Sequence, residues 1–356
     1  AAPTVATAIG SIRAQTLVDW ELIVVDDGSM DGTAAVLADL ARTDPRIRVI
    51  TQGPQGVAAA FNAGIAAARG ELIARIDADD EAHPERLAEQ VAFLAAPANR
   101  AVGVVSSLVA FGGDREKGEG YALHVDWLNT LVTPDEIALN RFVESPLANP
   151  SVMFRRELVA RHGGCRDGDF PEDYELWLRW LDAGVRMAKV PRVLLTWNDA
   201  PTRLTRTDAR YGPEAFFKMK AEWIAKWLAK ELGGENSEAR KPGLVHGFLA
   251  SELDLVRPVW IWGAGRHTRK RAARLEAHGV RICGYIDVDV KKTGRGIGGT
   301  GRPVIGEEAL PAAGGSAEGG QVFVLSYVTS RGARAYNRAK LVACGYVEGR
   351  DFLMCA

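Results

Sequence analysis

Apolar segments of two kinds alternate along the first half of the chain. Four apolar residues near the start recur at the spacing of one helical face: Val5, Ala8, Ile9 and Ile12. Residues 22–25, 47–50 and 71–76 are apolar runs of strand length, separated by segments with a helical pattern. We expect residues 22–25 to form a buried strand. Alternation of this kind predicts an α/β fold, with a largely parallel sheet and helices on both of its faces.

Two of the predicted strands end in clustered carboxylates. The first strand runs into Asp26 and Asp27, and the third runs into Asp77 and Asp79. Open α/β folds bind their ligands at this carboxyl edge of the sheet. Asp77 and Asp79 are two residues apart, so in an extended segment their side chains point to the same face. Paired oxygen ligands suit a divalent cation between protein and substrate phosphates, which predicts a metal-assisted nucleotide site.

Composition narrows the class of protein. The 356 residues are 47% hydrophobic and 25% charged, and the formal net charge is -1. This balance is ordinary for a globular protein and gives no electrostatic case for nucleic acid as a partner. The four cysteines show no C-x-x-C spacing, no apolar run approaches the ~20 residues that span a bilayer, and no signal peptide is visible. We therefore expect a cytoplasmic protein, with peripheral membrane association left open.

Five short motifs follow one another within the first 200 residues. They are VDDGS at 25–29, NAG at 62–64, DAD at 77–79, NPSVMFRR at 149–156 and PEDYELW at 171–177. In order and spacing they resemble family 2 glycosyltransferases of the GT-A fold. The resemblance implies an inverting, metal-dependent transfer of a sugar from a nucleotide-diphosphate donor. The acceptor would be a glycan, a lipid-linked sugar or a protein.

The resemblance also implies roles for individual residues. Asp79 would be the direct ligand of Mn²⁺ or Mg²⁺, with Asp77 as a second ligand nearer the ribose. Asp173 would deprotonate the acceptor hydroxyl, and the dipole of the helix that it opens would favour its ionised form. Asp27 would contact the nucleotide base, and Glu172 and Asn149 would also contact substrate.

Several of these residues also have a structural interpretation. Asp26 and Asp27 could simply terminate a strand and hold a turn, and Asn149 could hold the turn before Pro150. We expect Asp80 and Glu81 to be solvated carboxylates or helix N-terminal charges instead of ligands. Trp177 and Trp180, at helical spacing, are expected in the core instead of forming a sugar platform. Arg203 could close over a diphosphate, because guanidinium matches phosphate, or lie on a surface loop.

The start of the chain departs from the family pattern. Relatives begin with a central strand, which would lie between the strands that carry Asp27 and Asp77. This chain opens directly in its first predicted helix. Without the central strand, two rows of backbone donors and acceptors would lack partners. We therefore expect the natural N-terminus to be longer.

A second α/β pattern begins after residue 257. A strand at 259–262 leads into a tight turn with Gly263 and Gly265, and the next strand ends at Asp287. These three residues resemble a dinucleotide fingerprint that lacks its third glycine, and they form a candidate second nucleotide site. We predict a GT-A domain at 1–207, a helical linker at 208–256 and a smaller Rossmann-like domain at 257–356.

Two questions stay open for the second half. The helix over residues 216–232, with Trp223 and Trp227, is expected to pack across the domains, and a membrane-surface role is the alternative. Two functions other than glycosyl transfer also remain open. The C-terminal domain could be an NAD-linked sugar oxidoreductase or epimerase, for which Tyr336 and Lys340 have suitable spacing but lie late in the domain. The chain could also be a fragment that binds nucleotide sugar without turnover.

Overall fold

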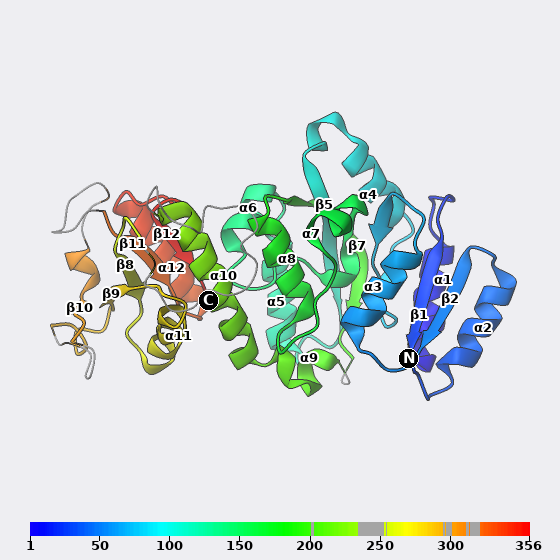
Figure 1. Cartoon of the computed structure of the whole chain (residues 1–356), viewed down its shortest axis with the longest axis horizontal. Helices are drawn as coiled ribbons and strands as arrows, with labels where there is room; N and C mark the ends of the chain where they lie inside the picture. Colours follow the sequence, from blue (N-terminus) through cyan, green and yellow to red (C-terminus); the bar gives the residue numbers. More distant parts are fainter. Residues whose placement is uncertain are drawn as a thin grey trace. The chain divides into compact units, whose positions relative to one another are not determined.

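The chain forms two compact units in the computed structural model (Figure 1). The structure describes residues 1–200, 203–233, 253, 255–294, 296, 301–310, 313 and 321–356. Unit 1 comprises Ala1–Ala138 and Ser145–Gly212, and unit 2 comprises Leu139–Glu144 and Pro213–Ala356. Residues 234–252 and 254, which belong to the predicted linker, lie outside the described residues.

Helices and strands alternate in unit 1 as the sequence pattern predicts. The strands are β1 (Leu22–Asp27), β2 (Ile47–Gln52), β3 (Leu72–Ala74), β4 (Glu81–Ala82), β5 (Val102–Gly112), β6 (Met153–Arg155) and β7 (Arg186–Asn198). The helices up to the end of this unit are α1 (Ala2–Arg13), α2 (Thr33–Thr43), α3 (Val57–Ala67), α4 (Arg86–Ala95), α5 (Glu119–Asn129), α6 (Pro134–Asn140), α7 (Glu157–His162), α8 (Glu172–Asp182) and α9 (Leu204–Thr207).

Strands β1 and β2 form a parallel pair of their own. The predicted helical face of α1 is buried, and its Val5 and Ile9 pack with Leu37 of α2 and Ile47 of β2. Most of β1 is only half-buried, so the expectation of a fully buried strand is wrong for residues 22–25. Within the described residues β1 pairs with β2 alone, and no strand links it to β3. The strand that we expect between them stays a prediction.

The second sheet of unit 1 has the order β3-β6-β5-β7-β4 and is mixed. Only the β5–β7 pair is parallel, while β3–β6, β5–β6 and β4–β7 are antiparallel. The prediction of a largely parallel sheet is therefore wrong for this five-stranded sheet. Alternating patterns give the order of elements along the chain but not the direction in which distant strands pair. Strand β4, for example, follows β3 closely in sequence but pairs with β7.

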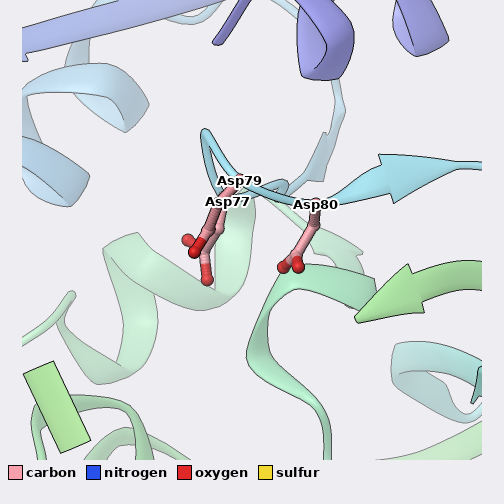
Figure 2. Close-up of side chains that lie close together, drawn as sticks. All are labelled: Asp77, Asp79 and Asp80. Carbon is pink, nitrogen blue, oxygen red and sulfur yellow. The ribbon is translucent and has the colours of Figure 1, made fainter. Parts of the chain in front are cut away.

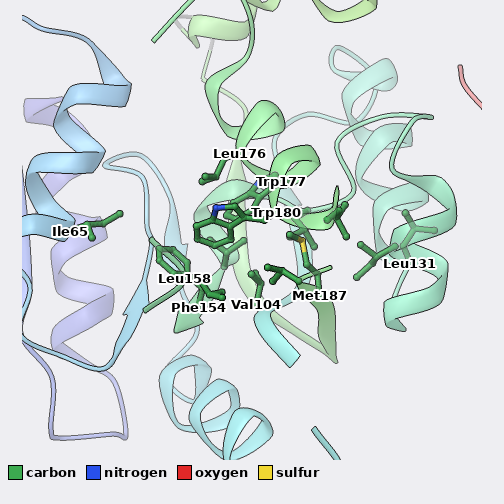
Figure 3. Close-up of a cluster of buried hydrophobic side chains, with 14 residues drawn as sticks. Ile65, Val104, Leu131, Phe154, Leu158, Leu176, Trp177, Trp180 and Met187 are labelled. Atoms are coloured by element: carbon green, nitrogen blue, oxygen red, sulfur yellow. The ribbon is translucent and has the colours of Figure 1, made fainter. Parts of the chain in front are cut away.

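Helix α8 is anchored by a large aromatic core. Trp177 and Trp180 are fully buried, with ring centroids 5.7 Å apart, and Phe154 of β6 lies 5.3 Å from Trp180 (Figure 3). The prediction that both tryptophans belong to the core is confirmed. Replacing such a side chain by alanine costs about 3–5 kcal/mol. This packing fixes the first turn of α8, which carries Glu172 and Asp173.

Unit 2 contains one five-stranded sheet in which every pair is parallel, in the order β10-β9-β8-β11-β12. Its strands are β8 (Val259–Trp262), β9 (Ile282–Ile286), β10 (Val304–Ile305), β11 (Phe323–Ser326) and β12 (Phe352–Met354). Its helices are α10 (Pro213–Leu232), α11 (Arg266–Glu276) and α12 (Arg331–Ala343). The sequence therefore predicted a parallel α/β unit correctly in this part of the chain.

Helix α10 is buried within unit 2. Trp223 and Trp227 are each 7% exposed, and the Trp227 ring lies 5.6 Å from Phe323 of β11. The membrane-surface alternative for this helix is therefore wrong, because it requires these tryptophans to be exposed. In the part of the chain that the structure describes, no helix has the length and apolar character needed to cross a bilayer.

Candidate active site

Three carboxylates meet in the loop between β3 and β4, residues 77–80, which we call the acidic loop. One oxygen from each of Asp77, Asp79 and Asp80 lies within 4.8 Å of the others. Figure 2 shows the side chains of Asp77 and Asp79 pointing the same way, with Asp80 beside them. Strand β3 ends at Ala74 and residues 78–79 form a turn. A turn, and not the extended segment that we predicted, thus brings these acids together.

Asp80 is not the solvated carboxylate that the sequence suggested. Its side chain is buried, with the residue 1% exposed, and one oxygen accepts the backbone N–H of Asn198 at 2.8 Å. The other oxygen, Oδ2, has no hydrogen-bond partner among the described residues. Glu81, the next residue, is exposed as expected. A buried carboxylate oxygen without a partner is costly, so it is a candidate position for a ligand.

Burial and mutual repulsion dominate the electrostatics of the acidic loop. Burial and the charge of Asp77 raise the pKa of Asp79, and the same two causes raise the pKa of Asp80 to about 8. A divalent cation would relieve this repulsion and take the oxygen ligands that it prefers. The three carboxylates, and the free oxygen of Asp80 in particular, therefore fit Mn²⁺ or Mg²⁺.

Arg75 connects the acidic loop with helix α8, and the sequence analysis missed it. Its Nη2 forms an ion pair with Asp77 at 2.7 Å, while its Nη1 is buried without a partner among the described residues. Burial lowers the pKa of Arg75, but the charges of Asp77 and Asp173 outweigh this effect and raise it. A charged residue inside an apolar run, two positions before Asp77, was the signal that could have revealed it.

Asp173 lies in the first turn of α8, where the sequence placed it. Burial raises its pKa to about 7, the charge of Glu172 adds to the rise, and Arg75 opposes it. The expectation that the helix dipole would keep this carboxylate readily ionised is therefore wrong, because burial dominates. Glu172 is buried and accepts the hydroxyl of Tyr211 at 2.6 Å. A carboxylate with a pKa near neutrality is suited to general-base chemistry.

Asn198, at the end of β7, binds the acidic loop from a distant part of the sequence. Besides its N–H bond to Asp80, its side-chain amide donates to the carbonyl oxygen of Asp79 at 2.7 Å. The carbonyl of Asn198 in turn accepts Arg203 Nη1 at 3.2 Å, and the same nitrogen donates to the Tyr121 hydroxyl at 2.5 Å. The structure thus brings Arg203 next to the acidic loop through Asn198.

Asp27 binds the neighbouring strand and the loop after it, and Asn149 lies in a short helix. Asp27 ends β1, and its carboxylate accepts Gln52 Nε2 at 2.7 Å and the N–H groups of Gln55 and Gly56 at 2.9 and 2.7 Å. These bonds, the one from Gln52 foremost, lower its pKa. Asn149 opens a short 3₁₀ helix, Asn149–Ser151. Their contacts with a nucleotide or acceptor stay predictions.

Asp26, beside Asp27, has a turn-forming role. The residue is 4% exposed and its carboxylate accepts the N–H of Ser29 at 3.0 Å. This hydrogen bond holds the turn after β1, so the structural interpretation of Asp26 is confirmed.

The candidate second nucleotide site lies in unit 2, after β8. Gly263 has a φ of +107°, which favours glycine, and Gly265 leaves open space where a Cβ would stand. Asp287 Oδ2 accepts the N–H of Ala264 at 2.7 Å, and Lys292 Nζ lies 3.1 and 3.2 Å from its two oxygens. Asp287 therefore already has partners in its own loop, and a nucleotide contact there stays a prediction.

The proposed acid–base pair of unit 2 is not arranged for such a role. The hydroxyl of Tyr336 donates to Glu307 at 2.7 Å, and Lys340 Nζ lies 3.7 Å from the same carboxylate. Both residues are on α12, and Tyr336 is 49% exposed. Nothing in these contacts favours the oxidoreductase alternative.

The grouped acids with adjacent guanidinium groups have the chemistry that a divalent cation and an anionic ligand would need. Residues 1–163 match the family model described as Glycosyl transferase family 2. This part of the chain therefore matches a family 2 glycosyltransferase domain. The predicted enzyme class, glycosyltransferase, is confirmed at this level.

Individual relatives carry the same description. An uncharacterized glycosyltransferase of Nostoc sp. is 33% identical over 181 residues, which are 49% of this chain and 52% of that protein. The O-antigen biosynthesis glycosyltransferase WbnJ of Escherichia coli is 28% identical over 63% of this chain and 83% of its own length. The chain thus spans about half the length of the Nostoc relative.

A solved structure is also similar. It is the mannosyltransferase PcManGT from Pyrobaculum calidifontis in complex with GDP-Man and Mn²⁺. The TM-score is 0.44 at 25% sequence identity, and the match covers 63% of this chain and 59% of that chain.

Proposed function

We propose that unit 1 transfers a sugar from a nucleotide-diphosphate donor to an acceptor hydroxyl, with inversion at the anomeric carbon. One observation carries the proposal. Asp77, Asp79 and Asp80 each place one oxygen within 4.8 Å of the others. Arg75 forms an ion pair with Asp77, and its charge also acts on Asp173, whose pKa it lowers. A cation and diphosphate site would then lie beside a carboxylate suited to accept a proton. Both parts are needed for glycosyl transfer by direct displacement.

Asp79 and Asp77 would hold the cation, Mn²⁺ or Mg²⁺, in this proposal. When bound, the cation would neutralise the charge that builds on the departing diphosphate. Arg203 would add a guanidinium to the same diphosphate, because its planar fork matches phosphate oxygens. The raised pKa values of Asp79 and Asp80 support this assignment, since burial and the charge of Asp77 outweigh the nearby arginines and a cation would offset them.

Asp173 would act as the base. Its carboxylate would accept the proton of the acceptor hydroxyl while the acceptor oxygen attacks the anomeric carbon. The bond from that carbon to the diphosphate oxygen breaks in the same step, and the diphosphate leaves with its electron pair. Attack opposite the leaving group inverts the configuration. The position of Asp173 in the first turn of the rigidly packed α8 supports this role.

The acceptor would belong to a surface polysaccharide or a related glycan. The similarity to WbnJ, named for O-antigen biosynthesis, supports this part of the proposal. A lipid-linked sugar or a protein acceptor would present the same hydroxyl chemistry. The described cysteines are all unpaired, which favours the reducing cytoplasm, where we place the protein.

We further propose that the C-terminal domain is Rossmann-like, at 257–356 after a GT-A domain at 1–207 and a linker at 208–256. Its strands, numbered along the chain, stand in the order 3-2-1-4-5, which is the doubly wound order 3-2-1-4-5-6 without its sixth strand. Ligands of such sheets bind where the strand order reverses, here between β8 and β11. Gly263 and Gly265 follow β8 directly.

The test of the proposed function is turnover of the donor. The chain is incubated with UDP-, GDP-, dTDP- and CDP-sugars, with Mn²⁺ or with a chelator, and release of nucleoside diphosphate is followed. Proton NMR of the liberated sugar gives its initial anomeric configuration. We expect metal-dependent release from one nucleotide class and an inverted anomer. Release that is independent of metal, or retention of configuration, would overturn the proposal.

A further inference from the structure

We propose that Tyr121 is a positioning residue for the donor diphosphate: its hydroxyl and ring hold Arg203 with one edge of the guanidinium open to phosphate oxygens. The inference deepens the function proposed above and rests on it. No sequence motif pointed to Tyr121, which lies on α5 and is 82 residues before Arg203.

The contacts of Arg203 fix both the position and the tilt of its guanidinium. Nη1 donates to the Tyr121 hydroxyl at 2.5 Å and to the carbonyl of Asn198 at 3.2 Å. The guanidinium carbon also lies 4.5 Å from the ring centroid of Tyr121 and 4.9 Å from that of Trp197. Arginine stacks favourably on aromatic faces, so two rings and two hydrogen bonds restrain one planar group.

The remaining donors of Arg203 are available. Its Nε and Nη2 form no hydrogen bond, and the side chain forms no ion pair, among the described residues. Arginine binds phosphate through two parallel N–H donors on one edge of the fork. Because Nη1 is already occupied, the edge made by Nε and Nη2 is the one left for a bidentate phosphate.

The open edge belongs to the same hydrogen-bonded network as the acidic loop. Asn198, which accepts Arg203, also donates its N–H to Asp80 at 2.8 Å and its side-chain amide to Asp79 at 2.7 Å. A diphosphate that bridges a cation on the acidic loop would therefore meet Arg203 a short distance away. Preorganisation of this kind lowers the entropy lost when the ligand binds.

Tyr121 is itself held in place. Its ring packs edge-on against Phe111 and Trp197, with centroids 5.6 and 5.0 Å away, and stacks on His124 at 6.2 Å. These contacts involve the ring and not the hydroxyl. Tyr121→Phe therefore keeps the packing and removes only the acceptor for Arg203, which separates a positioning role from a structural one.

The experiment compares nucleoside diphosphate with nucleoside monophosphate. Binding of UDP, GDP, dTDP and CDP, and of the matching monophosphates, is measured by calorimetry with Mn²⁺ for wild type, Tyr121→Phe, Arg203→Ala and the double variant. Tyr336→Phe is the matched control, since its hydroxyl also meets a charged group but in unit 2. Thermal unfolding checks that each variant is folded.

We expect Tyr121→Phe to weaken binding of the diphosphate about tenfold, the usual effect of losing one hydrogen bond to a charged group. Binding of the monophosphate should stay within about twofold, and Tyr336→Phe should match wild type. In the Arg203→Ala background, Tyr121→Phe should add almost nothing, because the two residues act through one group.

Three results would overturn the inference. The first is full diphosphate affinity in Tyr121→Phe. The second is an equal loss for mono- and diphosphate, which indicates a structural role, and the third is additive effects in the double variant. Failure of the proposed function looks different: wild type itself would bind none of the four diphosphates in the presence of Mn²⁺, and the inference would then fail with it.

Discussion

The acidic loop of unit 1 and the turn around Asp287 in unit 2 start from the same sequence signal, an acid at the end of an apolar strand. In the structure they differ in charge balance. Asp287 is bound by the N–H groups of Ala264 and Asp289 and by Lys292, and its pKa is lowered, since these contacts outweigh burial. In the acidic loop the pKa values of Asp79 and Asp80 are raised.

The difference shows how a strand-terminal acid can be interpreted. Where the protein supplies donors and a cation of its own, the acid stabilises a turn. Where it gathers acids and leaves an oxygen such as Asp80 Oδ2 without a partner, the missing counter-charge must come from a ligand. By this criterion the acidic loop is the proposed ligand site, and Asp27, with its three protein donors, resembles Asp287.

The largest effect is expected at Asp79. Asp79→Ala removes a cation ligand, so metal-stimulated release of nucleoside diphosphate should fall about 10⁴-fold, to the metal-free background. Asp39→Ala, a surface acid on α2, is the neutral control. Turnover is measured over a range of Mn²⁺ concentrations. The contrast between the acidic loop and the turn around Asp287 would be refuted if Asp79→Ala kept its response to metal, or if Asp287→Ala lost turnover to the same extent.

Asp173→Asn should separate chemistry from binding. The amide cannot accept the acceptor proton, so transfer should fall about 10³-fold, within the range of general-base catalysis. The dissociation constant of the donor should stay within about threefold, because the acidic loop is intact. Single-turnover kinetics and calorimetry on the same samples give both numbers. A variant that transfers sugar at the wild-type rate would exclude Asp173 as the base.

The pH dependence of transfer should report the same residue. The pKa of Asp173 is raised to about 7, and only the ionised carboxylate accepts a proton. The rate should therefore be constant above about pH 8 and fall tenfold per unit below about pH 6. The profile of kcat/KM from pH 5 to pH 9 tests this, with donor binding measured at each pH. A midpoint near the ordinary pKa of aspartate, about 4, would contradict the assignment.

Gly112→Ala should perturb the acidic loop indirectly. Gly112 of β5 pairs with Asn198, and a Cβ there would clash with the side-chain oxygen of Asn198. The amide that holds the Asp79 carbonyl would have to move. We expect turnover to fall about tenfold, as one hydrogen bond of about 1–1.5 kcal/mol is lost near the site. Gly120→Ala, where a Cβ meets nothing, is the matched control; equal rates for both variants would refute the role of Asn198.

The smallest effects concern stability and should have opposite signs. Asp80 has a raised pKa, so its contribution to stability declines as the pH rises from about 4 to about 8. Asp80→Asn should therefore raise the unfolding temperature at pH 8 in the presence of a chelator. Asp287 has a lowered pKa, so its contribution is present at neutral pH and is lost in acid. Asp287→Asn should cost about 1–2 kcal/mol at pH 7 and less below about pH 4.

Scanning calorimetry of both variants across pH measures this pair of effects. Two changes of the same sign at neutral pH would remove the distinction between the two regions.

Local signals in the sequence were sufficient for much of the fold. Helical spacing identified the buried face of α1, and apolar runs located β1, β2 and the strands β8 and β9 of unit 2. Asp77 and Asp79 stood out because both acids follow one apolar run. The direction of strand pairing in the mixed sheet was not accessible, because β4 pairs with β7 more than a hundred residues later.

The parts of the site that were missed depend on that long-range pairing. Asn198 meets Asp80 only because β7 ends beside the acidic loop, 118 residues further along the chain. Asp80 was misjudged for the same reason, since its burial comes from the neighbouring strand and not from its own segment. The pKa of Asp173 likewise reflects burial by the surrounding core, which outweighs the local helix dipole.

The most direct test of the cation and donor site is the thermal stability of the chain with UDP, GDP, dTDP or CDP, each with and without Mn²⁺. Binding to the native state alone raises the unfolding temperature. We predict an increase that requires both Mn²⁺ and one of these nucleotides, and that disappears in Asp79→Ala. No increase with any of the four, together with a clear increase on adding NAD, would contradict the account and move the chemistry to unit 2.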